Sequence, residues 1–143
     1  MYSVIVIPVL VGIVTQLIKL IIDGIPNNLN WQHLFNDYGG WPSSHTALVA
    51  SLTLMVGLMT GFANAPFAIA LVLLIIVVRD AMGFRREIGK NAVLTNMLAQ
   101  EVFPANPEAL LTEQIGHSQK EVLAGLIIGT VLTFLFYWLM LIV

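Results

Sequence analysis

The sequence predicts an all-α integral membrane protein with about four transmembrane helices. Hydrophobic residues make up 58% of the 143 residues and charged residues only 10%, against about 25% charged residues in an ordinary soluble domain. Long stretches without any charge alternate with short polar segments. This composition excludes a disordered chain and argues against a soluble enzyme. We therefore treat residues 1–143 as a single membrane domain.

Four apolar stretches are the expected membrane spans, at approximately residues 4–22, 44–60, 64–79 and 122–143. The first and the last have about the 20 residues needed to cross a bilayer. No Lys, Arg, Asp or Glu occurs between Asp37 and Arg79. That gap is too long for one span and fits two short ones, although a buried helical hairpin is an alternative interpretation.

A polar segment, residues 80–120, separates the third and fourth spans. Within it Ala81, Phe84, Ile88 and Ala92 recur at helical spacing among charged residues. This pattern predicts an amphipathic cytoplasmic helix that lies along the membrane interface.

The basic residues predict the orientation. All six Lys and Arg lie in or beside the loops 23–43 and 80–120, which four spans place on one side of the membrane. The positive-inside rule makes that side cytoplasmic. We expect a multi-pass protein of the cytoplasmic membrane.

The charge balance and the lack of cysteine exclude several function classes. The net charge is -2, and there is no cysteine. No basic surface for nucleic acid is expected, and neither is a disulfide framework, a thiol nucleophile or a Cys-type zinc site. We expect no metal and no cofactor.

Polar clusters on the expected cytoplasmic side are the candidate site. They lie at the mouths of the second and fourth spans and at the ends of the first and third. Their members are residues 39–46, residues 116–121, Arg79, Asp80, Arg85, Arg86, Gln16 and Lys19.

Several of these residues also have a purely structural interpretation. Ser43 is a good helix N-cap, and Ser118 with Glu121 matches a capping box. Lys19 can extend its ammonium to the interface. The cations that can hold anionic lipid headgroups are Arg85, Arg86 and Lys90.

The histidines at span mouths fit a structural role less well. His45 and His117 both lie where a span begins, and an ionisable group embedded in a membrane is a functional candidate by default. His33 lies in a polar loop and is interpreted as ordinary.

The candidate residues together suit a phosphate group. His117 and Glu121 are four residues apart, so we expect them on one helical face, where the carboxylate orients the imidazole. His45 could supply or remove a proton. The cations expected to neutralise an anion are Lys19, Arg79, Arg85 and Arg86.

Two motifs resemble those of a known superfamily. Pro42-Ser43-Ser44-His45 is similar to the Pro-Ser-Gly-His motif of the type 2 phosphatidic acid phosphatases, which include vanadium haloperoxidases. His117-x-x-x-Glu121 is similar to their His-x-x-x-Asp motif. The whole chain resembles the small divergent branch often labelled acid phosphatase/vanadium-dependent haloperoxidase-related.

The resemblance implies a role for each residue. His117 is the nucleophile that forms a phosphohistidine, Glu121 orients it, and His45 protonates the leaving alcohol. Ser43 and the amides around Ser44 bind phosphate oxygens. The other expected substrate-binding residues are Lys19, Gln16, Arg79, Asp80, Arg85 and Arg86.

The chain also departs from the superfamily pattern. Glu121 stands in place of Asp and Ser44 in place of Gly. Lys19 is not followed by the usual Arg-Pro, and Leu111-Thr112 occupies the position of a Ser-Arg pair. Other arginines would have to compensate in a phosphatase. Four spans are fewer than the usual six, so a homodimer would complete the bundle.

The predicted function is a metal-independent lipid phosphate phosphatase. Phosphatidylglycerophosphate, phosphatidate and prenyl phosphates all fit as substrates. The alternative is a lipid-phosphate binding or transport protein without hydrolysis. A Mg²⁺-dependent enzyme that uses Asp80 and Glu121 is a third hypothesis, which no acidic cluster supports. Haloperoxidase activity is least expected, because the span arrangement favours a lipid substrate.

Overall fold

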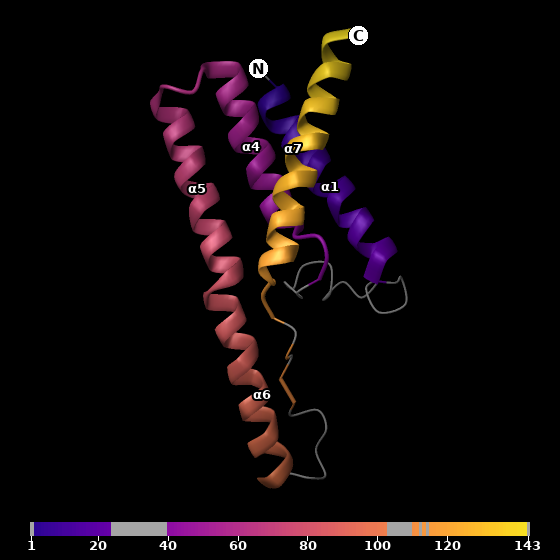
Figure 1. Cartoon of the computed structure of the whole chain (residues 1–143), viewed down its shortest axis with the longest axis vertical. Coiled ribbons are helices and arrows are strands. Elements are labelled where there is room, and N and C mark those ends of the chain that lie inside the picture. Colours follow the sequence, from indigo (N-terminus) through magenta and orange to yellow (C-terminus); the bar gives the residue numbers. More distant parts are fainter. Residues whose placement is uncertain (1, 24–39, 103–109, 112, 114, 143) are drawn as a thin grey trace.

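A computed structural model describes residues 2–23, 40–102, 110, 111, 113 and 115–142. Its helices are α1 (Ser3–Asp23), α4 (Ser44–Thr60), α5 (Ala65–Met82), α6 (Phe84–Val102) and α7 (Gln119–Ile142). Helix α4 is central: it packs against α1, α5 and α7, and α1 also contacts α7 (Figure 1).

The exterior of this bundle is apolar. By length and composition, α1, the α5–α6 rod and α7 can each cross a membrane, and α4 is a shorter apolar helix. Large apolar side chains such as Ile69 and Leu123 are exposed on the outer helices, as expected where lipid rather than water is the solvent. The chain is therefore an all-α membrane protein, as predicted. In the α4–α5 pair only α4 is largely enclosed, since the buried residues of α5 are just Ala70 and Ala81.

Local caps define where the helices begin and end. Ser43 caps α4, which stops at Gly61, where φ is 93°. Asn64 then caps α5 by accepting a hydrogen bond of 2.9 Å from the N–H of Phe67. Pro66 lies in the first turn of α5, where a missing N–H costs nothing. The two helices thus form a tight hairpin.

Helices α4 and α7 approach closely because α7 presents glycine to α4. A Cβ on Gly125 would overlap the carbonyl oxygen of Ser43, and one on Gly129 would lie 2.6 Å from that of Ala47. Small residues spaced by four let membrane helices pack backbone to backbone. Farther along, the Thr133 hydroxyl donates to Ser51 Oγ at 2.6 Å. This packing brings the first turns of α4 and α7 together.

Helix α6 is amphipathic, as predicted, but its direction differs from the prediction. After a break at Gly83 it continues the line of α5 beyond the bundle instead of turning aside (Figure 1). Its buried residues are Gly89, Ala92 and Asn96. Residues 111, 113 and 115 of the returning chain contact that face, which explains why α6 stays in line.

The two ends of the bundle have different characters. Both termini and the α4–α5 turn lie at one end (Figure 1). The end of α1, the α5–α6 junction and the starts of α4 and α7 lie at the other. The polar clusters identified in the sequence therefore gather at one end of the bundle.

Candidate functional site

The mouth of α4 is held by hydrogen bonds of Ser43. This residue is fully buried, and its Oγ lies 2.9 Å from Thr46 Oγ1 and accepts the Thr46 N–H at 3.5 Å. Its own N–H donates to the Glu121 carbonyl at 3.1 Å. The N-cap interpretation of Ser43 is confirmed, so its hydroxyl already has a structural task. The half-buried Ser44 begins the helix.

Helix α1 contributes a buried cation next to two imidazoles. Lys19 is only 9% exposed. Its charge acts on both His45, an exposed residue in the first turn of α4, and His117. Gln16 is half-buried one turn earlier on α1. Lys19, His45 and His117 thus form the centre of the site.

His117 lies in the segment just before α7 and is buried, with 5% of its surface exposed. Its backbone N–H donates to the Ala81 carbonyl at 3.0 Å. Burial, with the nearby charge of Lys19, lowers the pKa of His117 to about 4. The imidazole is therefore neutral near pH 7 and keeps a lone pair on one nitrogen.

The Nδ1 atom of His117 is buried and has no hydrogen-bond partner among the described residues. Leaving a buried polar atom unpaired costs about 1–3 kcal/mol. Such atoms are rare in native structures, and a catalytic role is one explanation for them.

Glu121 does not orient His117 in the way predicted. Helix α7 begins at Gln119, so His117 precedes the helix and the two residues do not share a helical face. One carboxylate oxygen of Glu121 accepts the Ser118 N–H at 2.9 Å, and its own N–H donates to Ser118 Oγ at 3.3 Å. The capping box is therefore confirmed. The charge of Glu121 still acts on His117, favouring its protonated form.

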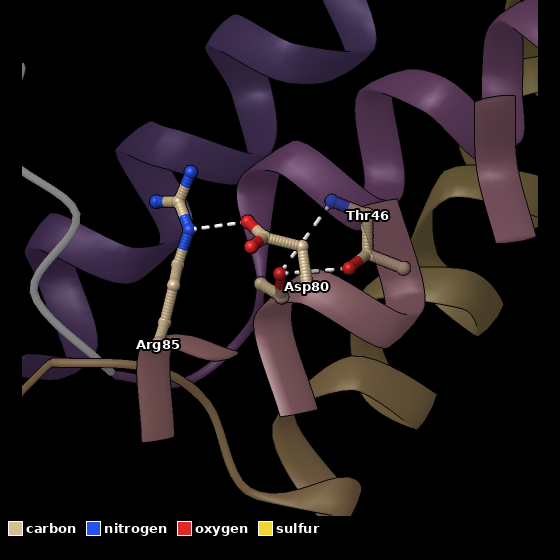
Figure 2. A network of polar contacts seen from close by, with 4 residues as sticks. Thr46, Asp80 and Arg85 are labelled. Carbon is tan, nitrogen blue, oxygen red and sulfur yellow. Dashed lines mark hydrogen bonds and ion pairs between the residues drawn. The ribbon is translucent and has the colours of Figure 1, made fainter. Parts of the chain in front are cut away.

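Arg85, just after the junction between α5 and α6, is an arginine whose charge acts on His117. Arg85 Nε donates to the Asp80 carboxylate at 2.5 Å across the break at Gly83, and Figure 2 draws this ion pair together with Thr46. Arg79 and Arg86 are exposed. The structure thus brings Lys19, Arg85, both site histidines and Glu121 into one electrostatic cluster.

Within the described ranges, no group of three or more His, Asp and Glu residues could hold a metal ion. The two carboxylates named for a Mg²⁺ site have other partners. Asp80 pairs with Arg85, and Glu121 caps α7. The arrangement instead provides cations and imidazoles, which suit an anion.

Comparison with known proteins identifies the family. The divergent PAP2 family matches residues 2–132. This chain belongs to the divergent PAP2 family. It is 34% identical over 135 residues to the uncharacterized membrane protein YuiD of Bacillus subtilis (strain 168), and the match covers 85% of each chain. No solved structure matches.

Three features of this divergent PAP2 protein were missed in the sequence. The Gly125-x-x-x-Gly129 spacing was visible and predicts close helix packing. Asn96, which binds the chain that leads to His117, gave no local signal. The Ala81 carbonyl could not be identified either, because its partner is thirty-six residues away in the chain.

Proposed function

We propose that this divergent PAP2 protein is a lipid phosphate phosphatase and that His117 is its nucleophile. The observation that carries the proposal is the buried, neutral imidazole of His117, whose Nδ1 has no hydrogen-bond partner in the part of the chain that the structure describes. The positive charges of Lys19 and Arg85 act on this imidazole. A neutral imidazole surrounded by cations can attack an anion that those cations bind.

Lys19 and Arg85 would hold the phosphate. Lys19 is buried at the end of α1, and Arg85 is held in place by Asp80. In this proposal Asp80 does not touch phosphate, since two anions would repel; it positions the guanidinium. The first turns of α4 and α7 add backbone N–H groups on the same end of the bundle.

The proposed reaction has two steps. The Nε2 lone pair of His117 attacks phosphorus, so that an N–P bond forms and the P–O bond to the lipid alcohol breaks. The leaving alkoxide takes a proton from His45. Water then gives a proton back to His45 and attacks phosphorus, which releases phosphate and restores Nε2.

In this proposal the Glu121 side chain changes its hydrogen-bond partner when substrate binds. With Nε2 as the attacking atom, Nδ1 carries the proton and needs an acceptor. The Glu121 carboxylate accepts the Ser118 N–H in this structure, yet its charge already acts on His117. Catalytic hydrogen bonds often tighten only when substrate is bound, so one carboxylate oxygen would turn to Nδ1 in the complex.

The substrate would enter from the cytoplasmic face. All six Lys and Arg lie on helix ends or segments at the end of the bundle that carries the site, which the positive-inside rule makes cytoplasmic. The chain has no native cysteine, so single cysteines at the exposed Ala63 and Gln100 can report sidedness. Labelling of Gln100→Cys from outside intact cells would contradict this orientation.

A lipid-phosphate binding or transport protein is the second candidate. The absence of Arg-Pro after Lys19 and the Leu111-Thr112 pair in place of Ser-Arg favour it. Such a protein would keep the cationic site and lack turnover.

The test is phosphate release from phosphatidylglycerophosphate, phosphatidate and prenyl phosphates by purified protein, with and without chelator. Variants His117→Ala, His45→Ala and Glu121→Gln are compared with Lys90→Ala, whose exposed side chain pairs with Glu87. We expect loss of release in the first, and a deficit in the second that is largest for poor alcohol leaving groups. Binding of every lipid phosphate without release by the unaltered protein would favour the transport candidate.

A further inference from the structure

The segment that leads into His117 runs along α6 as a strap, which we define by the described residues 110, 111, 113 and 115–117 (Figure 1). Asn96 of α6 holds its far end. The Asn96 amide donates to the Leu111 carbonyl and to Glu113 Oε1, both at 2.8 Å, and its Oδ1 accepts the Leu111 N–H at 2.7 Å. Asn96 is 3% exposed, so its side chain is buried, while its partners Leu111 and Glu113 are exposed.

Contacts continue along the helix toward the site. A Cβ on Gly89 would lie 2.8 Å from the carbonyl oxygens of Glu113 and Ile115, so the strap touches the α6 backbone there. Gly116 has a φ of 90°, and a Cβ on it would lie 2.5 Å from the Arg86 nitrogen. Only glycine combines this backbone conformation with so close an approach.

The strap and the rod run antiparallel in matched register. As the strap advances from Leu111 to His117, its partners step back along the helices from Asn96 to Ala81. The strap therefore runs beside the helices between two anchors, Asn96 at its far end and Ala81 at its near end.

We infer that Asn96 is a positioning residue for His117, which it holds in the site through the strap. This inference rests on the proposed function for its catalytic consequence. Asn96 lies far along α6 from the site, so it acts only through the segment that it anchors. Without its three hydrogen bonds the strap keeps its near anchor at Ala81 but loses its far one, and His117 gains freedom to leave its buried position.

The titratable groups that act on His117 come from four helices, while α5 contributes the Ala81 carbonyl. They are Lys19 of α1, His45 of α4, Arg85 of α6 and Glu121 of α7. Burial is the largest cause of the low pKa of His117. A looser strap would expose the ring and weaken all of these influences, so the titration of His117 reports its position directly.

The first test is an NMR titration of the His117 imidazole in the full-length protein in lipid nanodiscs, assigned with His117→Ala. We expect Asn96→Ala to move the midpoint upward from the low value of the unaltered protein toward the ordinary value of about 6.5. Asn91→Ala, an exposed asparagine on the same helix, should leave it unchanged. Glu113→Ala removes one of the three bonds at an exposed residue. It should shift the midpoint of the His117 titration upward by a smaller amount, and it provides the test if Asn96→Ala fails to fold.

The second test is the rate of phosphate release from phosphatidate. We expect Asn96→Ala to lower kcat by about tenfold to a hundredfold, as small displacements of reacting groups do, with KM nearly unchanged because the binding cations stay in place. An upward titration shift without phosphate release by any protein would support the positioning role and refute the proposed function. If Asn96→Ala and Glu113→Ala both titrate like Asn91→Ala, the positioning role is overturned.

Discussion

The pH dependence of phosphate release gives a quantitative test of the buried histidine. Since burial and Lys19 lower the pKa of His117 to about 4, roughly 90% of the molecules carry a neutral imidazole at pH 5. A histidine with the ordinary pKa of about 6.5 would be neutral in only about 3% of molecules at that pH. The acid limb of kcat/KM, which requires neutral His117, should therefore extend well below the range of an ordinary histidine.

Two variants should move this limb in opposite directions. The Lys19 cation disfavours protonation of His117, so Lys19→Met raises the pKa of His117 and moves the limb to higher pH. The Glu121 charge favours protonation, so Glu121→Gln lowers the pKa and moves the limb to lower pH. Lys90→Met is the matched control, because Lys90 is exposed and pairs with Glu87.

The assay is the pH profile of phosphate release from one lipid in nanodiscs. A phosphate monoester itself titrates near pH 6, so the comparison is between variants on the same substrate. An acid limb that shifts with neither Lys19→Met nor Glu121→Gln would show that His117 does not act as the neutral nucleophile.

Three further predictions follow from the same structure. Vanadate resembles the five-coordinate transition state of phosphoryl transfer, and Arg85→Ala should weaken its binding by about ten- to a hundredfold, the contribution of one charge-assisted contact. Lys90→Ala should leave vanadate binding unchanged. Equal vanadate affinities of the two variants would show that Arg85 is not part of the site. Gly125→Ala should destabilise the bundle by about 1–3 kcal/mol in a thermal unfolding assay, because the new Cβ overlaps the backbone of α4. Gly57→Ala should destabilise it less, because the new Cβ there contacts an exposed phenylalanine ring that can rotate away. EDTA should leave phosphate release unchanged, and its abolition by chelator with rescue by Mg²⁺ would revive the metal-dependent hypothesis.

The helices were predictable because their signals are local. Uncharged apolar stretches and caps such as Ser43 and Asn64 lie within a few residues of the helix that they define. The direction of α6 was not predictable in the same way. It depends on contacts between Asn96 and Leu111 and between Ala81 and His117, which only the folded chain brings together.

The sequence contained two incompatible signals for His117 and Glu121. If Ser118 is the N-cap of a capping box, His117 lies outside the helix and cannot share a face with Glu121. The capping box is the one that the structure shows. A capping box satisfies backbone N–H groups and therefore marks where a helix begins. Residues that precede it cannot be assumed to share a helical face with residues that follow it.

The arginines illustrate a similar limit. By sequence, Arg79, Arg85 and Arg86 were equal candidates for the anion site. Arg85 follows the break at Gly83, donates back to Asp80 and acts on His117, while the other two arginines are exposed. Because the helix is interrupted at Gly83, a periodicity argument across it could not identify which arginine acts on the site.

If a phosphoryl group passes through His117, the phosphohistidine intermediate can be detected directly. The protein is mixed with a lipid phosphate, quenched at alkaline pH, where phosphohistidine persists, and digested for mass spectrometry. We expect phosphorylation of the peptide that contains His117 in the unaltered protein, and neither that modification nor phosphate release in His117→Ala. Phosphate release by His117→Ala at an undiminished rate would contradict this expectation.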